Sequence, residues 1–163
     1  MKKTLLYLAL VSLPCWWACR QLPAEDHDVT QVEIVSVADA IDSTAPEGGL
    51  ALLKQNCYVC HNPAAPSHDE IVAPPLVAAK WRYSQSYSER AAFIENMTAY
   101  VHQPAADKAL MRGPVRRFGV MPPTTLSEDT IRSIVTYIYD NELEAPDWFA
   151  GHFEEEHGAS WKQ

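Results

Sequence analysis

The sequence carries little positive charge, shows no internal repeat and has no apolar run as long as a membrane span. Its 163 residues include 13 lysines and arginines against 21 aspartates and glutamates, which gives a formal net charge of −8. Such an acidic chain argues against nucleic acid or anionic lipid as a partner. The apolar run at residues 5–13 is shorter than the roughly 20 residues that a transmembrane helix needs, so we do not expect it to span a membrane.

An alternating strand pattern is also missing after residue 46. Apolar residues recur instead at helical spacing in stretches separated by proline-rich loops. One stretch contains Leu50 and Leu53, a second extends from Ser88 to Pro104, and a third begins at Ser127, a good N-cap residue. The sequence therefore predicts an all-α fold.

Cysteine is sparse, but two of the four cysteines fall in one motif, Cys57-Tyr58-Val59-Cys60-His61. Cys-x-x-Cys-His is the spacing at which haem becomes covalently attached to a protein. Two thiols on one helical turn add to the two vinyl groups of a haem, and the following histidine places an imidazole under the iron. The motif predicts one haem c attached through Cys57 and Cys60.

Two other uses of a Cys-x-x-Cys pair are disfavoured by what the sequence lacks. A four-ligand zinc site needs a further Cys or His pair downstream, and His68 has no spaced partner. A thioredoxin-like site opens a helix after a buried strand, whereas the residues before Cys57 are predicted to be helical. The remaining two cysteines, Cys15 and Cys19, lie in a segment that we expect to be removed or modified.

The N-terminal region has the order of a secretory signal peptide. Lys2 and Lys3 precede the apolar run, and the small residue Ala18 follows it. We expect residues 1–18 to be removed and the protein to be exported to the periplasm. Cys19 would then be a free N-terminal cysteine able to carry lipid, so we expect a membrane-anchored lipoprotein.

A soluble periplasmic protein is the alternative, because Trp16 occupies a position where lipoprotein signals usually have leucine. Cleavage after Ala24 would give that form. Residues 19–46 are acidic, with prolines at both ends, and this composition predicts a tether. Their β-prone patch at residues 32–37 favours an alternative interpretation, in which this segment is an extension that lies along the domain surface.

Methionine is also scarce, and a thioether is a soft ligand that stabilises ferrous iron and raises its reduction potential. Met97 falls on the apolar stripe of a predicted helix and Met111 follows Leu110 in an alanine-rich stretch. Both are therefore interpreted as packing residues. Met121 lies between Val120 and two prolines, which restrict the backbone. We expect Met121 to be the distal iron ligand.

With these motifs in this order, the chain resembles the class I monohaem c-type cytochromes from about residue 47 to about residue 142. The shared order is a helix leading into the Cys57-Tyr58-Val59-Cys60-His61 motif, then Pro74-Pro75-Leu76, then Val120-Met121-Pro122-Pro123, then a C-terminal helix. The resemblance implies the cytochrome c fold, with helices wrapped around one covalently bound haem. We expect this domain at residues 47–144 and an acidic extension at 145–163.

The resemblance also implies roles for individual residues. The two motif cysteines would form the thioether links, and His61 and Met121 would be the proximal and distal ligands. Pro74 would offer its carbonyl oxygen to the other ring nitrogen of His61. Leu76 would pack on the haem face.

Further contacts follow from the same family. Gly49 and Leu53 match first-helix positions that meet an aromatic residue of the last helix, here Tyr137. In the family, Trp, Tyr or Arg side chains from the middle of the chain commonly hydrogen-bond the haem propionates, with core packing as the alternative. The candidates here are Trp81, Arg82 and Tyr83.

Charge is unevenly distributed along the mature chain. Residues 76–121 carry seven basic and three acidic residues, or +4, whereas the rest of the mature chain carries four basic and eighteen acidic residues, or −14. A positive segment bordering a haem would orient a docking partner, although scattered solvated side chains would give the same count. In the tail, His152 and His157 flank three glutamates without coordination spacing. We expect a helix whose aromatic residues dock on the domain there, and no metal site.

The motifs and the resemblance together predict an electron carrier and not an enzyme. We expect a monomer that shuttles single electrons through a His/Met-ligated haem c between respiratory complexes. The resemblance implies a quinol-oxidising complex or a dehydrogenase as donor and a terminal oxidase as acceptor. Two alternatives stay open: the haem subunit of a larger periplasmic oxidoreductase, and an open-iron protein that acts as a peroxidase or binds gases.

Overall fold

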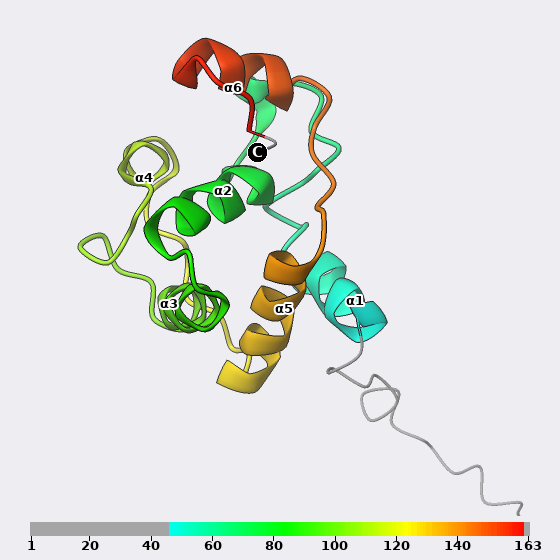
Figure 1. Cartoon of the computed structure of the whole chain (residues 1–163), viewed down its shortest axis with the longest axis vertical. Helices are drawn as coiled ribbons and strands as arrows, with labels where there is room; N and C mark the ends of the chain where they lie inside the picture. Colours follow the sequence, from blue (N-terminus) through cyan, green and yellow to red (C-terminus); the bar gives the residue numbers. More distant parts are fainter. Residues whose placement is uncertain (1–45, 162–163) are drawn as a thin grey trace, which may run out of the picture. The chain divides into compact units, whose positions relative to one another are not determined.

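The computed structural model describes residues 46–161. The expected signal peptide, the lipid site at Cys19 and nearly all of the acidic tether lie outside these residues. Within the described range the chain forms helices and no strand, so the prediction of an all-α fold is confirmed there (Figure 1). None of these helices is both long and apolar enough to cross a membrane. The elements are α1 (Pro46–Asn56), η2 (His68–Glu70), α2 (Leu76–Ser86), α3 (Arg90–His102), α4 (Arg112–Phe118), α5 (Glu128–Asp140) and α6 (Phe149–His157).

The apolar stripe of α5 forms one side of the core. Ser127 caps this helix, because its hydroxyl oxygen accepts a hydrogen bond from the backbone N–H of Thr130 (3.2 Å). Glu128 and Asp129 complement the helix dipole in the first turn. Residues three or four positions apart then face the interior and are at most 3 % exposed, namely Ile131, Ile134, Val135 and Ile138.

α1 crosses α5 at a glycine. A Cβ atom placed on Gly49 would lie 2.8 Å from the Cβ atom of Tyr137, which is closer than packed side chains approach. Leu53, one turn further along α1, is completely buried. The contact that the resemblance implied between the first and last helices of the domain is therefore present, and glycine is what permits it.

α3 packs against another side of α5. The Phe93 ring is completely buried and lies 5.0 Å from the Tyr139 ring and 5.8 Å from the Tyr83 ring of α2, centroid to centroid. Arg90 at the start of α3 donates two hydrogen bonds to Asp140 at the end of α5 (2.8 and 2.6 Å). These contacts join α2, α3 and α5 around one apolar core.

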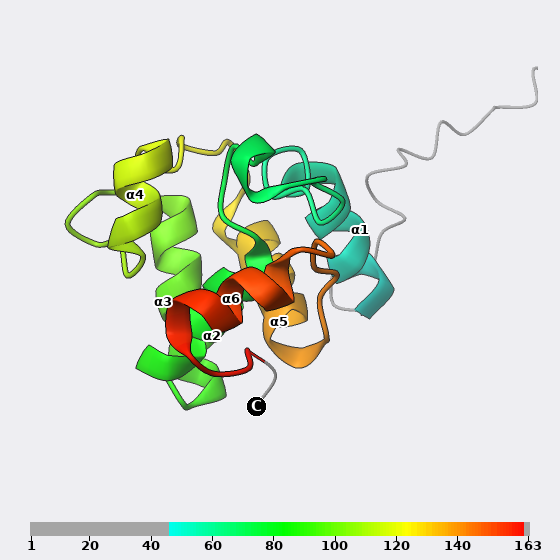
Figure 2. The same ribbon diagram turned by 90° about the horizontal axis from the view of Figure 1, so that it is seen from above.

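The last helix, α6, lies along α2, as Figures 1 and 2 show. Phe149 and Phe153, each 3 % exposed, pack against Val77 of α2. The indole N–H of Trp148 donates to the carbonyl oxygen of Ala65, in the loop that precedes α2 (2.9 Å). The C-terminal segment thus belongs to the same compact unit as the helices before it.

Candidate functional site

The turn after α1 forms the first wall of the site. The backbone N–H of Cys57 donates to the carbonyl oxygen of Leu53, and that of His61 donates to the carbonyl oxygen of Cys57, both at 2.9 Å. These bonds gather the motif residues into one tight turn. Cys57 is half-buried and Cys60 is exposed, and both are free thiols. Burial, with a smaller contribution from Cys60, raises the pKa of the Cys57 thiol to about 11.

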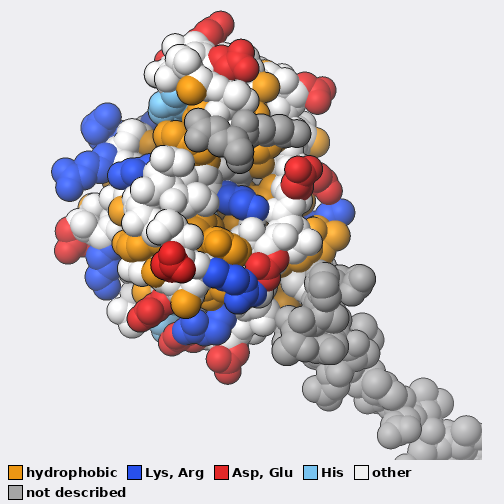
Figure 3. All heavy atoms as spheres, viewed as in Figure 1, with side chains coloured by type: hydrophobic (Ala, Val, Ile, Leu, Met, Phe, Trp, Pro, Cys, Tyr) orange, Lys and Arg blue, Asp and Glu red, His pale blue; other side chains and the backbone are white. Residues whose placement is uncertain are grey.

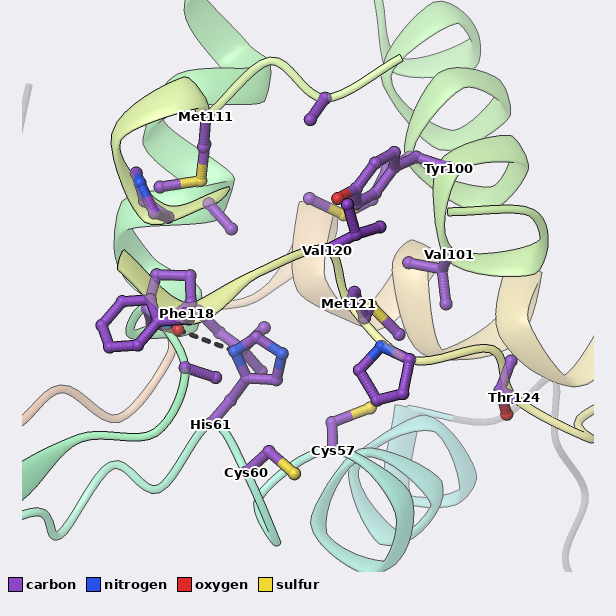
Figure 4. Close-up of a pocket in the computed structure, with 18 of the residues that line it drawn as sticks. Cys57, Cys60, His61, Tyr100, Val101, Met111, Phe118, Val120, Met121 and Thr124 are labelled. Carbon is purple, nitrogen blue, oxygen red and sulfur yellow. Dashed lines mark hydrogen bonds between the residues drawn. The ribbon is translucent and has the colours of Figure 1, made fainter. Parts of the chain in front are cut away.

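A cavity of about 500 Å³ adjoins this turn. Figure 4 shows Cys57, Cys60, His61 and Met121 around it. Its volume falls within the roughly 300–1,000 Å³ that is typical of cofactor and ligand pockets. Much of the rest of its wall is apolar and comes from three helices, with Leu76 and Tyr83 of α2, Met97 and Tyr100 of α3, and Ile131, Ile134, Val135 and Ile138 of α5.

The ring of His61 is held in a fixed orientation. Its Nδ1 atom lies 2.7 Å from the carbonyl oxygen of Pro74, which is the hydrogen bond that the resemblance implied. Because a carbonyl oxygen only accepts, Nδ1 carries the proton and Nε2 keeps its lone pair. Burial lowers the pKa of His61, and the bond to Pro74 opposes that shift. The result is a neutral imidazole with one nitrogen available as a ligand.

Met121 reaches the cavity from the segment that joins α4 to α5. Gly119 ends α4 with a φ of +82°, a conformation that favours glycine, and Pro122 and Pro123 restrict the backbone on the other side. Burial raises the pKa of Tyr100, and a hydrogen bond from the backbone N–H of Met121 to the Tyr100 oxygen opposes the shift. The thioether is therefore presented by a segment that is restrained at both ends and tied to α3.

The structure separates two aromatic residues that the sequence grouped as haem contacts. Tyr83 is 5 % exposed and lines the cavity. Trp81 lies elsewhere, packed edge-on against Phe153 of α6 with 4.9 Å between ring centroids. Residues two positions apart in an α-helix are about 200° apart around its axis, so the two side chains leave α2 on opposite faces. Arg82 also lies outside the cavity wall and donates through Nε to the carbonyl oxygen of Leu110 (3.4 Å). Trp81 and Arg82 are therefore not among the residues brought to this cavity.

Among the wall residues that were not predicted as part of a site are Tyr100 and Met111. Tyr100 follows Met97 by three positions, so α3 presents both on one face, and this spacing was the signal in the sequence. Met97 is also a core residue, as expected, at 4 % exposure. Met111 directly precedes α4 and adds a third thioether to the wall, beside those of Met97 and Met121, although nothing around it in the sequence marked it.

No family model, curated protein or solved structure matches this chain. The described residues define an all-helical domain in which a Cys-x-x-Cys-His turn and a methionine segment border one apolar cavity. Two thiols suit the covalent attachment of a haem, and a neutral imidazole and a thioether suit the ligation of its iron. The cavity thus fits that cofactor by its chemistry and its volume.

Proposed function

We propose that this protein is an exported electron-transfer protein with the cytochrome c fold, which carries one covalently attached haem c. The observation that supports this best is that Cys57, Cys60, His61 and Met121 all line one cavity of about 500 Å³. His61 and Met121 are 60 positions apart in the sequence. When bound, haem would supply an iron centre that takes up and releases one electron.

Each of these residues has a defined part in the proposal. Cys57 and Cys60 hold the cofactor covalently, and His61, oriented by Pro74, provides a nitrogen ligand. Met121 provides a soft thioether that favours the ferrous state and raises the reduction potential. The apolar residues of α2, α3 and α5 exclude water, and this also tunes the potential.

The exposed apolar residues support a role in transient docking. Large hydrophobic side chains are strongly exposed at three described positions, Val59 (77 %), Val72 (66 %) and Val120 (39 %). Val72 and Val120 line the first cavity, where a bound haem would cover them, whereas Val59 lies outside its wall. An exposed apolar side chain beside the proposed thioether links suits a partner that docks briefly to exchange an electron. In this proposal the donor is a quinol-oxidising complex or a dehydrogenase, the acceptor is a terminal oxidase, and a lipid on Cys19 keeps the monomer at the membrane.

Covalent attachment is the first step to test. The full chain is produced in a bacterial host that matures c-type cytochromes, and haem is then extracted with acidified organic solvent. The wild-type protein should keep its haem after denaturation, and the double variant Cys57→Ser/Cys60→Ser should release it. Met97→Leu, which keeps the cavity wall apolar, should behave as wild type. A wild-type chain that retains no haem would contradict the proposal.

Two further measurements separate the carrier from its alternatives. The ferrous carrier should show no immediate spectral response to carbon monoxide, because both axial positions are filled. An immediate response would indicate an open iron instead. A tightly bound partner that copurifies in fixed ratio would favour a subunit of a larger oxidoreductase over a shuttle.

A further inference from the structure

A second cavity lies between α2, α4 and α6, and the proposed electron carrier does not use it. Its volume is about 530 Å³, similar to that of the first. Neither the motif residues nor Met121 line it. Its wall contains arginine, histidine and tryptophan side chains and one carboxylate, and the members that matter most are Trp81, Arg82, Arg112, Arg117, Phe153 and Glu156.

Trp81 brings an unsatisfied hydrogen-bond donor to this wall. Its indole Nε1 is buried and has no partner among the described residues. Buried polar groups are nearly always paired, so this donor is unusual, but the nitrogen exposes less than 1 Å² and only the ring of Trp81 faces the cavity. Trp148, in the same aromatic cluster, shows the usual situation, because its N–H donates to the carbonyl oxygen of Ala65 at 2.9 Å.

The wall is positively charged in an acidic protein. Arg82 and Arg112 form no ion pair in the part of the chain that the structure describes, and Arg117 lies 3.7 Å from Asp69. Three arginines against Glu156 give a formal charge of 3 − 1, or +2, for the wall, whereas the chain as a whole carries −8. Figure 3 shows Lys and Arg side chains gathered along the edge that α4 forms. A concave surface of this sign concentrates anions.

Aromatic rings make up much of the remaining wall. Trp81 and Phe153 meet edge to face at 4.9 Å, and the ring of Phe153 lies 5.7 Å from that of Phe149. On the loop side, His152 stacks on His68 at 4.1 Å. A flat apolar body would pack well against such rings, whereas an inorganic oxyanion would use only the charged part of the wall.

We propose that this second cavity binds an aromatic carboxylate. The carboxylate would accept hydrogen bonds from the guanidinium groups of Arg82 and Arg112, and the ring would lie against the aromatic wall, which includes Trp81. Guanidinium groups favour carboxylates because two parallel N–H···O bonds form at once. The proposal rests on Arg82, Arg112 and the rings of α6, which line the second cavity alone, whereas Met111 and Phe118 line both cavities.

Calorimetric titration of the full mature chain with 1-naphthoate tests the proposal. One equivalent should bind saturably, with at least about tenfold higher affinity than 1-naphthalenemethanol, which has the same ring without the charge. Inorganic phosphate, which has charge without a ring, should bind about tenfold or more weakly than naphthoate.

Single substitutions then identify the site. Arg112→Gln removes a guanidinium and should weaken naphthoate binding about tenfold. Glu156→Gln removes the one carboxylate of the cavity wall and should strengthen naphthoate binding. The matched control is Arg132→Gln on α5, where Arg132 pairs with Glu128 (3.0 Å) away from this cavity, and it should change nothing.

Three results would overturn the assignment. They are the absence of saturable binding, equal affinity for naphthoate and its neutral alcohol, and equal affinity for naphthoate and phosphate. Arg112 and Glu156 are both exposed, so Arg112→Gln and Glu156→Gln should keep the fold, which circular dichroism checks. If neither of these variants shifts the affinity relative to Arg132→Gln, naphthoate binds elsewhere and the proposal is wrong.

Discussion

The Nδ1 atom of His61 and the carbonyl oxygen of Pro74 lie 2.7 Å apart, so the proposed iron ligand is oriented by the loop at residues 62–75. That loop is held in turn by the C-terminal segment, because the N–H of Trp148 donates to the carbonyl oxygen of Ala65 (2.9 Å). A hydrogen bond between two residues that are 83 positions apart in the sequence therefore supports the geometry of the first cavity.

Trp148→Phe tests this support. The substitution keeps an aromatic ring but removes the donor, and it should lower the free energy of unfolding by about 1 kcal/mol. A looser loop would weaken the bond that makes His61 a stronger donor to iron, so the reduction potential should rise. Thermal melts and redox titration of the haem-loaded protein measure the two effects.

Trp81→Phe is the matched control for that experiment. The N–H of Trp81 has no hydrogen-bond partner among the described residues, so no bond is lost when it is removed. Its stability and potential should stay close to those of the wild type. Equal changes in the two variants would mean that ring packing, and not the bond to Ala65, is what matters.

Gly49→Ala should destabilise the crossing of α1 and α5. The added Cβ would lie 2.8 Å from the Cβ atom of Tyr137, so the helices must move apart. Overpacking of this kind costs about 1–3 kcal/mol in the free energy of unfolding, measured by denaturant titration. Gly151→Ala in α6 is the control: no atom lies within 4 Å of its added Cβ, and it should be neutral or stabilising by up to about 1 kcal/mol.

The pair between Arg90 and Asp140 should give stability a pH dependence. Hydrogen bonding to Arg90 is the main cause that lowers the pKa of Asp140 below 3.8. The pKa of Asp140 is lower in the folded protein than in the unfolded chain. The ion pair therefore contributes its full stabilisation at pH values above the unfolded pKa, and this stabilisation is lost as the pH falls through the folded pKa. Arg90→Gln should therefore lower the melting temperature near neutral pH, and the difference from wild type should vanish in acid.

The size of that difference should be small, since the side chains of Arg90 and Asp140 are 52 % and 40 % exposed. Added salt should reduce it further. In an Asp140→Asn background, Arg90→Gln should have no further effect. A difference of the same size in acid and at neutral pH would show that Arg90 acts through packing instead.

The sequence predicted those features that local patterns encode. The stripe that ends with Ile138 and the N-cap at Ser127 specified α5, and the spacing of Cys57, Cys60 and His61 specified the cysteine-histidine turn. Proline positions marked the segment around Met121. In each case a short run of residues carries the whole signal, so no knowledge of distant packing was needed.

Features that depend on distant packing escaped prediction. Trp81 and Tyr83 were grouped by proximity in the sequence, but the helix that contains them directs the two side chains to different cavities. Met111 lies just before α4 and joins the wall of the first cavity through tertiary structure that its sequence neighbours do not mark. The second cavity exists only because α6 lies along α2. The aromatic residues of the tail predicted a docked helix, but no local pattern specified α2 as the place where it docks.

The central claim is that His61 and Met121 ligate the iron of a covalently bound haem, and ferric absorption spectroscopy tests it most directly. The wild-type protein should show the weak far-red sulfur-to-iron band. Met97→Leu and Met111→Leu, which alter the other two thioethers of the wall, should keep that band, and Met121→Ala should lose it. A high-spin wild-type spectrum without the band, or a band that survives Met121→Ala, would contradict the account.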